Sequence, residues 1–201
     1  MKSKGPYLKP LRREDTPELE PTYQDLINFL GFVPNTELTM ARKPRSTKAL
    51  IDFVKTLYSS PVLPEPLLYL VGLVTSSAAG CQYCASHNVN RAHDMGISGE
   101  KIAAVWEFQT SPLFEPSERA ALSFAFKAGQ SPSAVEAEDH EELAKYFNEV
   151  EITELLFVIC QFGVFNRFNS AVAATIEATP LALCKSYLSQ TDFDPGKHDV
   201  S

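Results

Sequence analysis

The chain has 201 residues, of which 44% are hydrophobic, and its formal net charge at pH 7 is −7. This length is enough for one domain with a substantial core. The acidic balance excludes nucleic acid as the main partner, because phosphate binding requires a basic surface. Four cysteines are too few for a disulfide scaffold.

The N-terminal sequence has neither an apolar core nor a small-residue cleavage site, so we expect no secretory signal. The longest apolar run, residues 67–79, is too short and too polar to span a bilayer. We therefore expect a cytoplasmic protein that has no membrane partner.

Residues 1–21 are polar and rich in proline, and we predict that they form an arm that drapes over a neighbour. From Thr22 onward the pattern predicts one helix after another. The first helix is predicted over 22–30 and ends at Gly31, and the second begins near Ser46. Prolines at 61, 64 and 66 then interrupt the chain.

The segment 66–79 is apolar nearly all round, which predicts a helix at the centre of the core. Gly80 marks a joint, and a further helix is predicted over 81–94, ended by Gly96. Later helices are predicted over 98–108, from Ser117, over 138–147, from Thr153 and over 181–188. No segment alternates with period two, so we predict an all-α, single-domain helical bundle over residues 22–189 and a solvated polar tail over 190–201.

A weak internal similarity appears when the chain is aligned with itself at a shift of 85 residues. YLVGLVTSSAAGCQYCAS then lies over ELLFVICQFGVFNRFNSA, with Cys81 on Asn166 and Cys84 on Asn169. This favours two degenerate helical repeats, of which one carries the thiols. The same shift places Glu154 over Tyr69, although a polar first-turn residue explains Glu154 equally well.

The segment GCQYCASH, residues 80–87, contains the most reactive side chains of the sequence. On a helix, positions three or four apart share a face, so Cys81, Cys84 and His87 can lie together. A helix N-terminus favours thiolate, and thiolate is the form that attacks a peroxide or a disulfide. A redox dithiol, with Cys84 attacking, Cys81 resolving and His87 accepting a proton, is therefore chemically complete.

Two other interpretations of the cysteine pair remain open. The three side chains could supply three zinc ligands, but the sequence has no second C-x-x-C or H-x-x-x-H, so we expect no metal. The two cysteines could also be buried structural thiols. A thioredoxin-like dithiol is excluded, because it would follow a β-strand. The other cysteines, Cys160 and Cys184, are predicted to pack in the core.

At GCQYCASH the sequence resembles the active-site segment of the alkylhydroperoxidase D-like, or carboxymuconolactone decarboxylase, superfamily. LFEPSERAALSFAFKAG is similar to the "F-x-P-x-E-R-A-x-L-x-x-A" helix of that family, and ITELLFVICQFGVFNRFNSAV to its long terminal helix. The resemblance extends over residues 22–180. It implies an all-helical fold, a homo-oligomer and, in the cysteine-bearing branch, thiol peroxidase chemistry in which Cys84 attacks and Cys81 resolves.

The chain departs from the family pattern in the proton relay. The usual relay histidine position is Asn88, and His87 lies one residue earlier. The usual relay glutamate position is Tyr69, and the nearest carboxylate is Glu65, one turn before it. These residues are candidate relay or supporting groups, although a phenol is a poor base at neutral pH.

From the residues and the resemblance together we expect an enzyme: a peroxidase that reduces small organic or hydrogen peroxides without a cofactor. It would depend on a dithiol or protein reductant. Two alternatives remain: a carboxymuconolactone decarboxylase-like enzyme, and a non-catalytic member that kept the fold as a redox sensor or assembly module.

Overall fold

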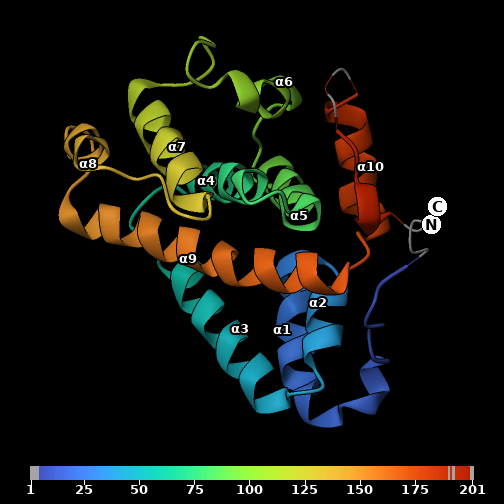
Figure 1. The fold of residues 1–201 in the computed structure, drawn as a ribbon. Coiled ribbons are helices and arrows are strands. Elements are labelled where there is room, and N and C mark those ends of the chain that lie inside the picture. The colour runs from blue at the N-terminus through green and yellow to red at the C-terminus, as the bar shows by residue number, and fades with distance from the viewer. Residues whose placement is uncertain (1–4, 190, 192, 200–201) are drawn as a thin grey trace.

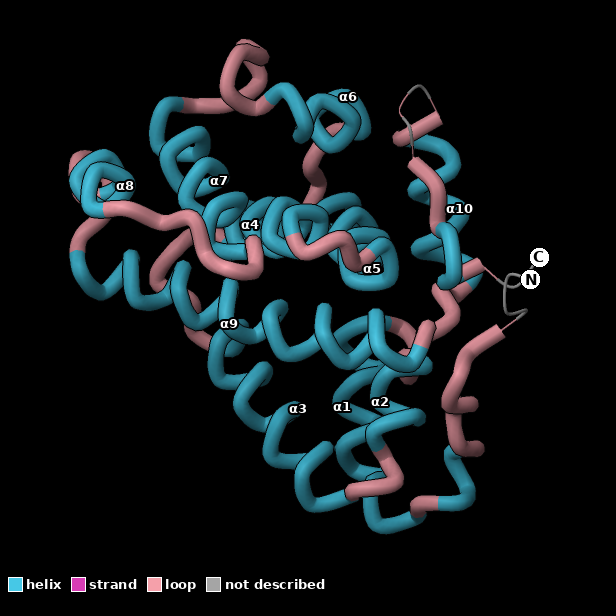
Figure 2. Tube along the Cα trace, viewed as in Figure 1, coloured by secondary structure: helices cyan, strands magenta, loops and turns pink. Residues whose placement is uncertain are grey.

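A computed structural model describes residues 5–189, 191 and 193–199, and every regular element within these ranges is a helix (Figures 1 and 2). The all-α prediction is therefore confirmed. In chain order the α-helices are α1 (Glu20–Leu30), α2 (Asn35–Met40), α3 (Pro44–Ser59), α4 (Glu65–Ala78), α5 (Gln82–Asp94), α6 (Gly99–Ala103), α7 (Pro116–Gly129), α8 (Ala137–Leu143), α9 (Glu149–Val172) and α10 (Ala178–Tyr187).

The long helix α9 crosses the middle of the molecule and divides the other helices into two groups (Figure 1). Helices α4, α5 and α7 pack on one side of it and α3 on the other, with α1 and α2 beside α3, while α10 packs against α5. By length and composition α9 could cross a membrane. In this fold it packs against α3, α4, α5 and α7 and turns Phe162, Asn166 and Asn169 into the interior.

Helix α4 forms the centre of the core, as its apolar sequence predicted. Every residue from Leu67 to Ser76 is buried. Burial of one large aliphatic side chain contributes about 1.5–3 kcal/mol, so this helix supplies a large share of the stabilising area. Gly72 permits its neighbours to approach, because a Cβ at this position would overlap Asn88 of α5 and Phe162 of α9.

The turn between α4 and α5 fixes the position of the first cysteine. Gly80 has φ +69°, a left-handed conformation that glycine adopts without strain. Its N–H donates to the carbonyl of Ser77 (2.9 Å), and the N–H of Cys81 donates to the carbonyl of Ser76 (2.9 Å). These two bonds form a Schellman motif, and they make Cys81 the N-cap of α5.

Some of the less regular segments differ from what the sequence indicated. Helix α2 was not predicted, because it is only six residues long and two of its residues are threonine. Within the expected arm, Thr16 and Leu19 are buried, and the N–H groups of Tyr7 and Leu11 donate to the carbonyls of Val172 (2.8 Å) and Leu38 (3.1 Å). The expected solvated tail also packs back on the core where it is described: His198 is buried, and its carbonyl accepts the N–H of Ile176 (3.0 Å).

The prediction for the two remaining cysteines holds for one of them. Cys184 is buried in the packing of α10, whereas Cys160 is exposed on α9. The outward position of Cys160 follows from the period of the helix, because Phe157 and Val164 on the same face are exposed too.

Candidate active site

Cys81 and Cys84 lie together at the start of α5, as their spacing predicted. Both are free thiols and both are buried. Cys81 is the N-cap residue, so its side chain lies beside backbone N–H groups that have no helical partner. Cys84, one turn later, lines a cavity, whereas Cys81 is not among the residues that line it.

The two thiols differ in how readily they ionise. The pKa of Cys81 is lowered, first because the Cys84 thiol can donate a hydrogen bond to a Cys81 thiolate. The first-turn N–H groups of Tyr83 and Cys84 and the ammonium group of Lys197 lower it further, against the effect of burial. Burial raises the pKa of Cys84, and the neighbouring Cys81 adds to this rise. The pair therefore carries its first negative charge on Cys81 and keeps the proton on Cys84.

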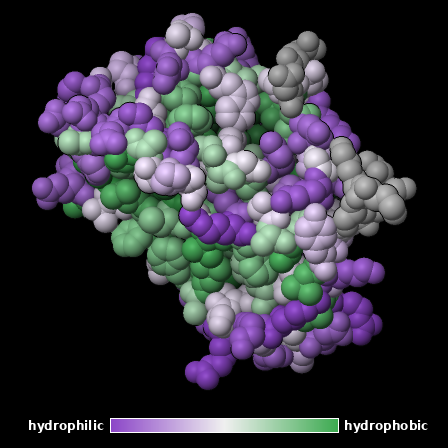
Figure 3. All heavy atoms as spheres, in the orientation of Figure 1, coloured by the Kyte–Doolittle hydropathy of each residue, from purple (hydrophilic) through white to green (hydrophobic). Residues whose placement is uncertain are grey.

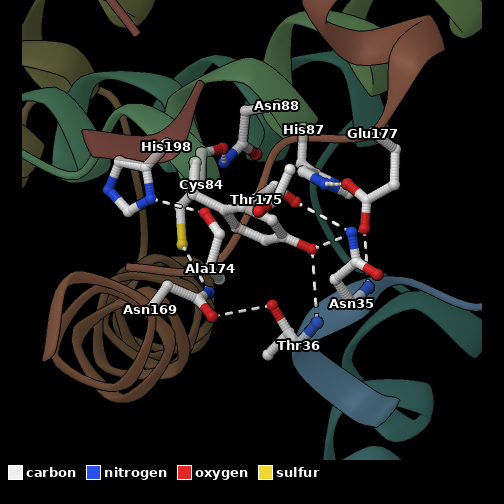
Figure 4. Close-up of polar contacts among 11 residues, drawn as sticks. Asn35, Thr36, Cys84, His87, Asn88, Asn169, Ala174, Thr175, Glu177 and His198 are labelled. Carbon is white, nitrogen blue, oxygen red and sulfur yellow. Dashed lines mark hydrogen bonds and ion pairs between the residues drawn. The ribbon is translucent and has the colours of Figure 1, made fainter. Parts of the chain in front are cut away.

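A side-chain amide from α9 supports the Cys84 sulfur (Figure 4). Asn169 Nδ2 donates to Cys84 Sγ at 3.3 Å, and this contact lowers the pKa of Cys84 against the effect of burial. The hydroxyl of Thr36 on α2 donates to Asn169 Oδ1 at 2.7 Å and fixes the amide with its N–H₂ group toward the sulfur. Cys84 and Asn169, which the internal similarity aligns at a shift of 85 residues, are therefore in contact.

His87 faces the same cavity but does not bind the thiol directly. Its Nε2 lies 2.6 Å from Glu177 Oε2, and the ring stacks on Tyr83. The Tyr83 hydroxyl donates to Glu177 Oε1 (2.9 Å), and the backbone N–H of Thr36 lies 3.4 Å from the Tyr83 oxygen. Figure 4 shows these contacts as a continuous chain that runs from His87 to the Cys84 sulfur.

Glu177 is the carboxylate that pairs with the histidine. It precedes α10 as its N-cap residue and is largely buried. Burial raises its pKa, but His87, the N–H of Asn35 and the hydroxyl of Tyr83 together outweigh burial and lower it. Glu177 is therefore a carboxylate at neutral pH, and its burial is compensated by three donors.

The other candidate relay residues take different positions. Tyr69 lines the cavity, stacks on Tyr58 with ring centroids 5.3 Å apart and accepts a bond from Arg91 Nη2 (3.3 Å). Asn88 also lines the cavity, and its amide donates to the Cys84 carbonyl at 2.9 Å. Glu65 is the first residue of α4 and does not line the cavity. The structure therefore brings together Cys81, Cys84, His87, Tyr69 and Asn88, but not Glu65.

Glu154 does not take the place of the missing relay glutamate. Its carboxylate accepts the backbone N–H groups of Val62 and Leu63 at 2.7–3.1 Å, outside the cavity. Its role is to fix the segment that enters α4.

The cavity at Cys84 has a volume of about 110 Å³. Its walls are mainly aromatic and aliphatic, from Leu26, Phe29, Ile51, Val54, Tyr58, Phe162 and Phe165. A second cavity of about 340 Å³ shares several of these walls. For comparison, an apolar cavity of about 150 Å³ binds benzene. The cavity at Cys84 is smaller than this, so a small organic molecule beside the sulfur would also occupy the adjacent larger cavity.

Nothing in the described residues forms a metal centre, since no group of three or more His, Cys, Asp and Glu side chains is placed to hold an ion. The ring of His198 lies 6.1 Å from the Tyr83 ring, and its Nδ1 lies 2.6 Å from the Ala174 carbonyl oxygen (Figure 4).

Sequence reasoning missed Glu177, Thr36, Glu37 and Asn169 as members of the site. Glu177 lies 90 residues from His87 and shows no local pattern beyond its place before a helix. Thr36 and Glu37 lie on α2, the helix that was not predicted. Asn169 alone had an indication in the sequence, through its alignment with Cys84 in the internal similarity.

Comparison with known proteins agrees with this geometry. A sequence model of the carboxymuconolactone decarboxylase family matches residues 44–127, a range that includes both thiols. The chain is 33% identical to the protein YnjA of Escherichia coli K12 over 92 residues, which are 46% of this chain and half of that protein.

Solved structures match nearly the whole chain. The debrominase Bmp8 is 37% identical to this chain, with a TM-score of 0.84. Bmp8 was solved alone and as a cysteine-to-alanine variant in complex with 2,3,4-tribromopyrrole. The match to that complex covers 90% of this chain and 96% of Bmp8. A peroxidase-related protein with an alkylhydroperoxidase AhpD core from Ralstonia eutropha JMP134 is 20% identical, with a TM-score of 0.76 over 86% of this chain and 94% of that one, and shares the fold. The chain therefore belongs to the carboxymuconolactone decarboxylase superfamily, in which it has the all-α fold of the alkylhydroperoxidase D-like proteins.

Proposed function

We propose that this protein is a dithiol reductase that removes an electrophilic atom from a small organic molecule held in the aromatic cavity. The observation that carries the proposal is the position of the two sulfurs. Cys84 faces the cavity, and Cys81, whose pKa is lowered, is placed to take the Cys84 proton and later to displace the captured atom. The reaction needs no cofactor.

The cycle has two steps. The Cys81 thiolate accepts the Cys84 proton while the Cys84 sulfur attacks the electrophilic atom of the substrate. Cys81 then displaces that atom from Cys84 and closes a disulfide, which an external dithiol or protein thiol reduces. A reducing compartment such as the cytoplasm would supply the reductant.

The first candidate substrate is an organic hydroperoxide. Attack on the outer oxygen gives a Cys84 sulfenic acid and an alcohol, and disulfide formation then releases water. The apolar walls favour an alkyl or aryl hydroperoxide over hydrogen peroxide, because a small polar oxidant gains nothing from such walls.

The second candidate is a halogenated aromatic ring, which the similarity to the debrominase Bmp8 favours. Attack of Cys84 on the halogen would give a sulfenyl halide and a ring carbanion, which takes a proton. Cys81 would then release halide and close the disulfide. The aromatic walls suit a flat ring through offset stacking and edge contacts.

A decarboxylase function has less support. The cation in the cavity is Arg91, and it is engaged by Asp94 (3.2 Å), by the Phe29 carbonyl (3.1 Å) and by Tyr69. Proton chemistry on a carboxylated lactone would also leave two thiols without a role.

The test uses two single variants. With dithiothreitol present, we expect Cys84→Ser to abolish loss of substrate. Without any reductant, we expect Cys81→Ser to complete one turnover and stop with Cys84 oxidised, as read by intact mass. Bromide release from 2,3,4-tribromopyrrole and consumption of cumene hydroperoxide, measured side by side, separate the two candidates. Full turnover of either substrate by Cys84→Ser would contradict the proposal.

A further inference from the structure

Glu37 on α2 is a buried carboxyl group that has no role in the cycle described above. Its side chain lines the same cavity as the Cys84 sulfur, and the residue is only 6% exposed. One of its oxygens, Oε2, is buried and has no hydrogen-bond partner among the described residues. A carboxyl oxygen without a partner inside an apolar cavity is costly, and this cost indicates a use.

The surroundings of Glu37 keep its proton in place. Burial is the main cause that raises its pKa from 4.5 to about 8, and the nearby Glu177 carboxylate raises it further. No ion pair to Glu37 exists within the described ranges, and the charge of Arg91 is engaged by Asp94. The other titratable groups around the cavity are Tyr58, Tyr69, Tyr83, Cys84 and His87. At neutral pH the group is therefore a neutral acid that shares the cavity with the Cys84 thiol.

We infer that Glu37 is the general acid of the reaction and donates its proton to the leaving group when Cys84 takes the electrophilic atom from the substrate; this rests on the proposed function. With an organic hydroperoxide, the O–O bond breaks as the S–O bond forms. Cys81 receives the Cys84 proton, Glu37 protonates the departing alkoxide, and the products are a sulfenic acid, an alcohol and the Glu37 carboxylate.

The resolving step and the reductant complete the balance. Cys81 attacks the sulfenic acid and water leaves, after which an external dithiol reduces the disulfide and Glu37 recovers a proton from solvent. With a halogenated ring, the same proton would go to the ring carbon. In both cases the acid acts on a strongly basic leaving group, for which general acid catalysis contributes about 10²- to 10⁴-fold.

Leaving-group basicity provides the test. In tert-butyl hydroperoxide the leaving group is a strongly basic alkoxide, whereas in peracetic acid it is acetate, which needs no proton. We expect Glu37→Gln to slow the loss of free thiols with tert-butyl hydroperoxide by at least about 100-fold at pH 6.5. The rate with peracetic acid should change by less than about threefold. Glu154→Gln, the matched control outside the cavity, should follow the wild type with both oxidants.

The outcomes are distinct. An equal loss of rate with both oxidants would show a role in folding or access and would overturn the inference, as would an unchanged rate with both. If the wild-type thiols react with both oxidants no faster than a small thiol in solution does, the proposed function is wrong instead.

A measurement on the wild type covers the case in which Glu37→Gln does not fold. The rate with tert-butyl hydroperoxide should fall above pH about 8, as Glu37 loses its proton. Alkylation of Cys84 by iodoacetamide, which needs thiolate but no acid, should not fall there. A hydroperoxide rate that continues to rise through pH 9 would contradict the role of Glu37.

Discussion

At the scale of the residue, the site separates the sulfur that ionises from the sulfur that meets the substrate. The pKa of Cys81 is lowered first by the hydrogen bond from the Cys84 thiol and then by the helix N-terminus and Lys197, while Cys84 is held in an apolar environment. This arrangement delays charge at Cys84 until the reaction begins. The chain of bonds through Asn169, Thr36, Tyr83 and Glu177 then fixes the geometry around it.

Asn169 is predicted to be a positioning residue for the Cys84 sulfur. Asn169→Leu removes the donor at 3.3 Å without loss of volume, so the pKa of Cys84 should rise further and thiolate should form less often. We expect the rate of alkylation of Cys84 by iodoacetamide at pH 7.5 to fall about tenfold, the equivalent of about 1.4 kcal/mol. Cys184→Ala removes a buried thiol that does not line the cavity and serves as the control.

Thr36→Val tests the same point through the orientation of the amide. It removes the hydroxyl that donates to Asn169 Oδ1. The rate of alkylation of Cys84 should therefore fall, by less than in Asn169→Leu, and the pH profile of alkylation should shift toward higher pH. An unshifted pH profile in both variants would show that Asn169 serves packing alone.

At the scale of the element, the cavity depends on the close approach of α4, α5 and α9. Gly72 lies where these helices meet. Gly72→Ala should lower the free energy of unfolding by about 1–3 kcal/mol, because the new Cβ forces Asn88 and Phe162 apart. Both residues line the cavity, so turnover should fall as well. Urea denaturation and steady-state kinetics measure the two effects.

Gly163 on α9 is the matched control for this prediction. A Cβ there would approach only the flexible end of the Arg167 side chain. Gly163→Ala should therefore be neutral or raise the free energy of unfolding by up to about 1 kcal/mol through helix propensity. Equal effects of the two substitutions would contradict the packing argument.

The elements also show what could be predicted from the sequence. Helices α4 and α5 were predicted to within about two residues, because an apolar run, Gly80 and Gly96 mark their limits locally. Helix α2 was missed, because a six-residue helix is stabilised by tertiary contacts such as the bond from Thr36 to Asn169. The partner of His87 was missed for a similar reason, since the contact joins segments that are 90 residues apart.

At the scale of the whole molecule, α9 has both an inner and an outer role. Its inner face carries Asn166, Asn169 and Phe162, and its outer face carries Phe157, Cys160 and Val164. No charged residue lies between Glu154 and Arg167. Figure 3 shows apolar atoms gathered over this part of the surface, where α9 passes α3. An exposed apolar face of this kind usually meets a partner.

We propose that the outer face of α9 binds a second copy of this chain and that the protein is a homo-oligomer. Phe157 and Val164 are 47% and 49% exposed, so a charge placed between two copies would be buried without a partner. Val164→Lys should therefore shift the mass measured by light scattering after size exclusion from oligomer to monomer, with the dissociation constant raised at least about tenfold. Glu100→Lys on α6 makes a larger positive charge change, of +2 instead of +1, away from α9 and should leave the mass unchanged. If the wild type is a monomer at about 100 μM, or if Val164→Lys keeps the wild-type mass, the outer face of α9 is not the interface.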